Sequence, residues 1–88
     1  MVTKTVTVIN AQGFHMRPAT VFAGEMGKFS SKITLETNGR TVDAKSLMNI
    51  IAACIKCGAE VKVTCEGEDE AAALAKAVEM IESGLGEA

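Results

Sequence analysis

The chain has 88 residues, a formal net charge of −2 at pH 7 and only 3% aromatic side chains, all of them Phe. This length fits one small domain with its own hydrophobic core, so we expect residues 1–88 to form a single domain. The acidic balance and the lack of Trp and Tyr argue against a nucleic-acid-binding protein, which needs a basic surface and aromatic platforms for the bases.

A strand and a helix are predicted in the first third of the chain. Val2, Val6 and Val8 recur with a period of two, with Thr3, Thr5 and Thr7 between them, and β-branched residues at this spacing are typical of a half-buried strand. From Met16 to about Phe29 the spacing becomes helical, and we expect Gly27 to end this helix. Pro18 is compatible with its first turn, where backbone N–H groups lack partners. The predicted buried face of the helix consists of Ala19, Phe22, Ala23 and Met26.

A hairpin and a short helix are predicted next. Two alternating runs within residues 32–44 flank Asn38-Gly39, the dipeptide favoured in a type I′ turn. Ser46 is a suitable N-cap for a helix that runs through Ile55 and stops before Gly58.

The last third of the chain predicts a strand followed by a helix. Val61, Val63 and Cys65 alternate with polar residues, and an acidic stretch at 68–70 then suits the positive end of a helix dipole. The predicted apolar stripe of this helix consists of Leu74, Val78, Ile81 and Leu85. The order β-α-β-β-α-β-α predicts an α+β fold with a four-stranded, mainly antiparallel sheet and three helices on one face.

The most informative segment is NAQGFHMRPAT, residues 10–20, which contains the only histidine, one of two arginines and the only proline. Gly13 permits a tight reversal before His15, and the helix that begins after His15 offers unpaired N–H groups to an anion. Arg17 adds a planar guanidinium group that matches phosphate or carboxylate. Arg17 and the helix start both favour a neutral imidazole, whose ring nitrogen carries the lone pair of a nucleophile. The cluster therefore suggests transient phosphorylation of His15.

NAQGFHMRPAT, DAKSLMNI and the closing EGEDEAAALAKAVEMI together resemble the HPr family, the histidine-containing phosphocarriers of the bacterial sugar phosphotransferase system. The resemblance covers the whole chain and implies an open-faced sandwich fold. It implies a phosphoryl relay for sugar uptake, from phosphoenolpyruvate through enzyme I to Nδ1 of His15, and then to the IIA domains of sugar permeases. On this reading Arg17 steadies the phosphoryl oxygens, the Met16 and Arg17 N–H groups receive them, and Pro18 fixes the helix start. The protein would be a relay rather than an enzyme, without a cofactor or metal.

DAKSLMNI resembles the regulatory site of the Gram-positive-type branch of this family. The resemblance implies that an ATP-dependent HPr kinase/phosphorylase modifies Ser46 and that a catabolite regulator is a further partner. Ser46 also suits a helix cap, and a phosphate there adds negative charge at a helix N-terminus. The expected docking residues are Met16, Thr20, Lys45, Leu47, Met48 and Ile51. Burial in the core is the alternative for Ile51, and a solvated strand end is the alternative for Lys45.

Three positions depart from the family pattern. Phe14 stands where Leu or Ile is usual, Met16 where Ala is usual, and Cys54 where Gly is common. Because Met16 adjoins the expected phosphorylation site, we expect these departures to affect partner preference rather than the relay itself.

The sequence also carries predictions about compartment and cysteines. No apolar run has the length of a signal peptide or a membrane span, so we expect a cytoplasmic protein without membrane insertion. Nothing in the sequence suggests more than a monomer, so a monomer is expected. Three cysteines indicate reduced thiols. Cys54 and Cys57 form a C-x-x-C, which with Cys65 and His15 could be imagined as a zinc site, but redox pairs normally lie at a helix N-terminus, so we favour plain thiols. The remaining alternative function is a regulatory domain whose His15 and Arg17 bind an anionic metabolite without covalent change.

Overall fold

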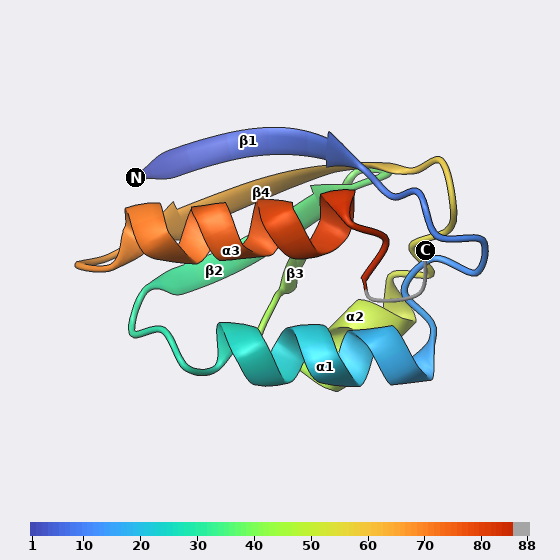
Figure 1. Ribbon diagram of the computed structural model, residues 1–88, viewed down its shortest axis with the longest axis horizontal. Helices are drawn as coiled ribbons and strands as arrows, with labels where there is room; N and C mark the ends of the chain where they lie inside the picture. The colour runs from blue at the N-terminus through green and yellow to red at the C-terminus, as the bar shows by residue number, and fades with distance from the viewer. Residues whose placement is uncertain (86–88) are drawn as a thin grey trace.

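A computed structural model describes residues 1–85 (Figure 1). The elements follow the predicted order, and they are β1 (Val2–Thr7), α1 (Met16–Met26), β2 (Lys32–Thr37), β3 (Arg40–Asp43), α2 (Leu47–Ala52), β4 (Glu60–Glu66) and α3 (Glu70–Glu82). Within the described residues, no helix has the length and apolar character needed to cross a membrane.

The four strands form one sheet in the order β1-β4-β2-β3, and all three pairings are antiparallel. Strands β4 and β2 are central, and β1 and β3 form the two edges. The three helices cover one face, with α3 lying along β1 and β4 and with α1 beside α2 (Figure 1). The α+β class and the predicted topology are therefore confirmed.

Alternation along the strands decides which side chains are buried. Leu35 and Val63 face each other across β2 and β4 and are fully buried beneath the helices. On the other face, which no helix covers, Thr3 and Thr64 are neighbours, and their hydroxyl groups lie 3.1 Å apart. The helices complete the core with Phe22, Met26, Ile50, Ala73, Ala77 and Ile81.

The hairpin between β2 and β3 has the predicted turn. Asn38 and Gly39 have φ values of 51° and 76°, and two successive positive values are the signature of a type I′ turn.

Of the two predicted helix ends, the first was confirmed and the second was wrong. The first helix ends at Met26 with Gly27 as its C-cap, as predicted, although the helical spacing in the sequence continues to about Phe29, which lies in the following turn. The second helix ends at Ala52 and does not reach Ile55. Cys54 has a φ of 53°, so the chain leaves the helix through a left-handed residue well before the predicted stop at Gly58.

The stripe predicted for the last helix was partly wrong. Val78 and Ile81 are buried as expected, but Ala73 and Ala77 complete the buried face and Leu74 is only half-buried. Leu85 is buried but lies beyond the helix, where the chain has turned.

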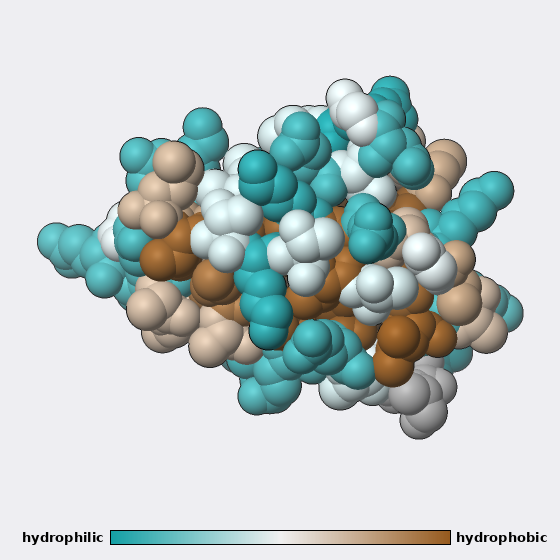
Figure 2. Space-filling model, turned by 90° about the horizontal axis from the view of Figure 1, so that it is seen from above, coloured by the Kyte–Doolittle hydropathy of each residue, from teal (hydrophilic) through white to brown (hydrophobic). Residues whose placement is uncertain are grey.

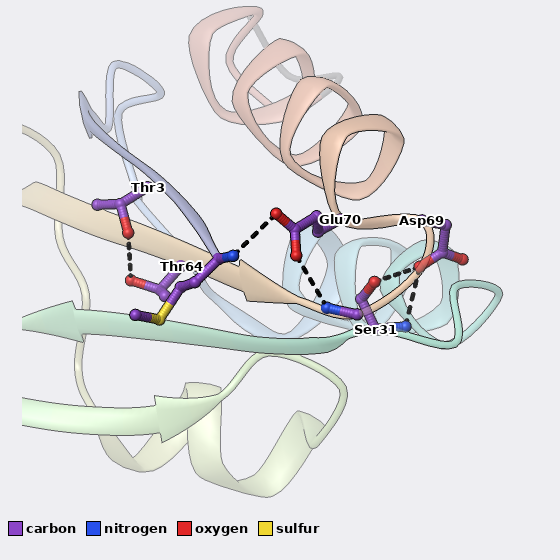
Figure 3. A network of polar contacts seen from close by, with 7 residues as sticks. Thr3, Ser31, Thr64, Asp69 and Glu70 are labelled. Carbon is purple, nitrogen blue, oxygen red and sulfur yellow. Dashed lines mark hydrogen bonds and ion pairs between the residues drawn. The ribbon is translucent and has the colours of Figure 1, made fainter.

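The acidic start of α3 holds two other parts of the chain (Figure 3). The Asp69 carboxylate accepts hydrogen bonds from the N–H groups of Ser30 and Ser31, each at 2.9 Å, and from the Ser31 hydroxyl. These bonds, that of the Ser31 hydroxyl foremost, lower the pKa of Asp69 to about 2. Glu70 lies 2.9 Å from the amino group of Met1 and accepts a bond from the Gly67 N–H. The α1–β2 loop and the start of β1 are thereby fixed to α3.

Candidate functional site

A tight turn precedes α1 and sets the position of His15. Gly13 has a φ of 62°, and its N–H group donates to the Asn10 carbonyl at 3.0 Å. The buried Asn10 side chain donates in turn to the Gly13 carbonyl at 2.6 Å, and that carbonyl also receives the His15 N–H at 3.0 Å. The main chain leading to His15 is therefore held by short local hydrogen bonds.

The loop of residues 54–59 packs against this turn and binds it through main-chain hydrogen bonds. The Ile55 carbonyl accepts the Phe14 N–H at 2.9 Å, and the Gly58 N–H donates to the Val8 carbonyl at 2.8 Å. A Cβ atom on Gly13 would collide with the same Ile55 carbonyl. The Phe14 ring is buried and packs edge-on against Phe22, with ring centroids 5.1 Å apart. The turn is therefore anchored both to the 54–59 loop and to the interior of α1.

His15 occupies the N-cap position of α1. Its backbone is extended, its carbonyl accepts the Ala19 N–H at 3.0 Å, and its side chain is half-buried. Met16 and Arg17 are the first two helical residues, and their N–H groups have no hydrogen-bond partner between residues 1 and 85. Pro18 is the third helical residue and is buried. A helix start of this kind presents free N–H groups and a positive dipole end.

The surface at this helix start is suited to an anion. His15 and Arg17 line a shallow depression of about 260 Å³ together with Ala11 and Gln12. Arg17 is exposed, and the first turn of α1 has no acidic residue. A nucleophilic ring nitrogen, an exposed guanidinium group and two free N–H groups are therefore brought together, which is the set required to accept and neutralise a phosphoryl group.

Ser46 is the N-cap of α2, as predicted. Its hydroxyl oxygen accepts hydrogen bonds from the backbone N–H of Asn49 at 3.3 Å and from the Asn49 side chain at 2.9 Å. Lys45, the residue before Ser46, is half-buried, and its ammonium group donates to the Phe29 carbonyl at 2.7 Å. Lys45 is therefore tied to the loop after α1 rather than solvated at a strand end.

The other expected docking residues lie on α1 and α2, which pack side by side (Figure 1). Met16 and Met48 are 58% and 73% exposed, which is unusual for large apolar side chains. Leu47 and Ile51 are half-buried against the core, so Ile51 is neither a full core residue nor a free surface residue. Thr20 is exposed, and its hydroxyl donates to the Met16 carbonyl.

The three cysteines do not form a metal centre. Cys54 and Cys57 are exposed in the loop after α2, whereas Cys65 is buried in β4. Burial, followed by the charges of Glu70 and Asp69, raises the pKa of the Cys65 thiol. Among residues 1–85, no group of three His, Cys, Asp or Glu side chains could hold a metal ion.

The sequence-based prediction missed two features that hold the His15 turn in place, the Asn10 side chain and the loop of residues 54–59. Asn10 was not singled out, although an Asn three residues before a Gly is a recognisable turn signal. For the 54–59 loop, the sequence indicates only the end of a helix and a pair of cysteines. The contact of this loop with Gly13 joins positions more than forty residues apart, for which a single sequence carries no local signal.

Comparisons with known proteins show the family of the chain. A family model described as "PTS HPr component phosphorylation site" matches residues 2–83. The phosphocarrier protein HPr of Treponema pallidum is 45% identical over 74 residues, which is 84% of each chain, and the HPr-like protein Crh of Bacillus subtilis is 40% identical over 86% of this chain and 89% of its own. A crystal structure of HPr from Thermoanaerobacter tengcongensis superposes with a TM-score of 0.95 at 40% identity, covering 100% of this chain and 99% of that one.

Proposed function

Because the chain belongs to the HPr family of phosphocarriers of the phosphotransferase system, we propose that His15 is the residue that carries the phosphoryl group. The observation that supports this most directly is the position of His15 at the N-cap of α1, beside Arg17 and the two free N–H groups. Enzyme I, charged from phosphoenolpyruvate, is the donor, and the IIA domains of sugar permeases are the acceptors.

The proposed reaction exchanges one bond to phosphorus for another. The lone pair of His15 Nδ1 attacks the phosphorus atom held by enzyme I, a new N–P bond forms, and the bond to the donor breaks. The other ring nitrogen keeps its proton, so no separate base is needed. In the second transfer the same N–P bond breaks as the acceptor attacks.

The residues around His15 have separate roles in this proposal. The Met16 and Arg17 N–H groups receive phosphoryl oxygens, and the Arg17 guanidinium balances their charge. Pro18 has no N–H group and a fixed φ, which suits the early helical position that it occupies. Residues 1–88 act as a single domain and a relay protein, so each turnover leaves the carrier unchanged without small-molecule chemistry of its own.

Ser46 is proposed as the regulatory phosphorylation site, modified by an ATP-dependent HPr kinase/phosphorylase. Its place at the N-cap of α2 supports this, because a phosphate on that oxygen adds about −1.5 to −2 charge where backbone N–H groups point. The likeness to Crh, which a solution structure describes as the catabolite repression HPr of Bacillus subtilis, is in keeping with a link to carbon catabolite control through a catabolite regulator.

The proposed docking surface consists of Met16, Thr20, Lys45, Leu47, Met48 and Ile51. The exposed, flexible side chains of Met16 and Met48 suit a surface that fits several partners in turn. Ser46 lies between Lys45 and Leu47 of this surface. A phosphate on Ser46 therefore weakens the binding of partners, because its charge and its bound water stand in the contact area. We place the protein in the bacterial cytoplasm as a monomer.

The relay is tested by incubating the protein with enzyme I, Mg²⁺ and phosphoenolpyruvate, with His15→Ala as the control. Intact mass and ³¹P NMR should show one acid-labile, base-stable phosphate on the wild type and none on the variant. A protein that binds phosphate but gains no mass would instead be a non-covalent anion-binding regulatory domain.

A further inference from the structure

Strand β1 has one side without a neighbour. The N–H and C=O groups of Val8 point toward the β4 side, where they bond Ala59 and Gly58. These groups alternate in direction along an antiparallel strand, so those of Thr3, Thr5 and Thr7 point to the open side. No strand pairs there within residues 1–85. An open strand edge is a template for pairing with another chain.

A single charged side chain interrupts the apolar surface beside this edge. Lys4 lies between Val2 and Val6 on the face that carries the helices, directly opposite the buried Val63. It borders a depression of about 270 Å³ whose other lining residues are Val2, Ala71, Leu74, Ala75 and Val78. Figure 2, which looks onto β1 and α3, shows apolar side chains in a band that polar side chains interrupt. Lys4 forms no ion pair with any residue from 1 to 85.

Apart from Lys4, the edge is well suited to a second copy of the same chain. Two β1 strands related by a two-fold axis would pair through Thr3, Thr5 and Thr7, and threonines make favourable cross-strand pairs. The valines and the α3 residues of both copies would meet on the other face.

The charge of Lys4 opposes this pairing in both of the registers that align most of the strand. With Thr5 opposite Thr5 of the second copy, the two Lys4 residues are diagonal neighbours, whose spacing is about 7–8 Å. With Thr3 opposite Thr5, Lys4 faces Lys4 directly. In either register two like charges without partners would enter an apolar layer, which is unfavourable both for solvation and for repulsion.

We propose that the β1 edge and the depression beside it form a self-association surface, and that Lys4 is the residue that prevents a second copy from occupying it. This surface is separate from the phosphoryl-transfer site, and its assignment does not depend on the role of His15.

The test is the oligomeric state of Lys4→Val, measured by analytical ultracentrifugation over a wide concentration range. We expect wild type and Lys4→Arg to remain monomeric, and Lys4→Val to associate with a constant at least about 30-fold larger, the factor that corresponds to two unit charges at this spacing and an effective dielectric constant near 20. Lys4→Thr removes the charge with less added hydrophobicity and should give an intermediate result. Circular dichroism confirms that each variant is folded.

A second substitution locates the interface. Thr5→Pro removes an N–H group on the open edge without removing a bond to β4, and proline is tolerated there. The double variant Lys4→Val/Thr5→Pro should therefore be monomeric again. A monomeric Lys4→Val and Lys4→Thr at every concentration would overturn the proposal, as would association that persists in the double variant, because it would then use another surface.

Discussion

Gly13 and Ile55 are in direct main-chain contact, although they belong to different loops. The Ile55 carbonyl accepts the N–H of the residue after Gly13, and a Cβ atom on Gly13 would collide with that oxygen and lie 2.7 Å from Cα of Lys56. The turn that presents His15 therefore requires glycine for two separate reasons, its positive φ and its lack of a side chain.

Gly13→Ala should consequently lower the free energy of unfolding by about 2–5 kcal/mol. This is the sum of the cost of a non-glycine residue in the left-handed conformation and the cost of an overpacked contact. Chemical denaturation measures this loss. Gly39→Ala is the matched control, since Gly39 also has a positive φ but a Cβ atom added there would have no neighbouring atom within 4 Å. Equal losses in the two variants would contradict the steric part of the explanation.

Arg17→Ala should slow phosphorylation by enzyme I by about 10- to 100-fold, because one charge-assisted hydrogen bond to the phosphoryl group is lost. Stability should hardly change, since Arg17 is exposed. Arg17→Lys keeps the charge without the planar fork and should recover part of the rate. Initial rates from enzyme I of known concentration decide this, and a wild-type rate in Arg17→Ala would remove Arg17 from the mechanism.

Ser46→Asp should raise the KM for phosphorylation by enzyme I and leave kcat nearly unchanged, because its added charge acts on docking. Ser46→Asn is the neutral control, since Asn is an equally good N-cap. Ser46→Ala should destabilise the fold by about 1 kcal/mol through loss of the cap. Steady-state kinetics separate the two constants; a collapsed kcat with an unchanged KM would contradict an effect on docking.

Cys54→Gly should stabilise the protein by about 1 kcal/mol, because Cys54 has a φ of 53°, which glycine adopts without steric cost. Cys54→Ser removes the thiol but keeps the strained backbone and should show no such gain. Cys57 lacks a positive φ, so Cys57→Gly should not stabilise either. Thermal unfolding of the three variants tests the assignment.

The hydrogen bonds that the Asp69 carboxylate accepts from Ser30 and Ser31 should make the free energy of unfolding fall in acid. The folded-state pKa of about 2 lies below the usual 3.8, so the contribution of Asp69 is fully present above about pH 4 and is lost as the pH falls through 2. The Tm difference between wild type and Asp69→Asn should therefore shrink steadily from pH 5 to pH 2. Glu68→Gln, at a neighbouring exposed position, serves as the control, and a difference that is constant with pH would show that ionisation of Asp69 is not the cause.

The order of elements could be predicted because each element has a local signal. Alternation marks β1 and β4, Asn38-Gly39 marks the hairpin, and Ser46 marks the start of α2. The placement of His15 at a helix start followed in the same way from Gly13 and Pro18, since both residues restrict the local backbone.

The end of α2 and the loop contacts could not be predicted in this way. The end of α2 depends on Cys54 adopting a conformation that cysteine rarely takes. The α1–β2 loop is held by Asp69, which lies almost forty residues away in the chain. Asn10 looked like an ordinary polar loop residue, and only the folded chain shows that its side chain is buried.

The pairing of β1 with β4 has a consequence for how the protein is made. β1 is synthesised before β4, yet β4, residues 60–66, is its one sheet neighbour among residues 1–85, and α3 is the helix that covers it. At ordinary translation rates Glu60 is added about 3–10 s after Thr7. During that interval the valine-rich segment has no native partner, so the pairing of β1 must wait until residues 60–66 have been synthesised, and nascent chains arrested before β4 should leave β1 accessible to chaperones and proteases.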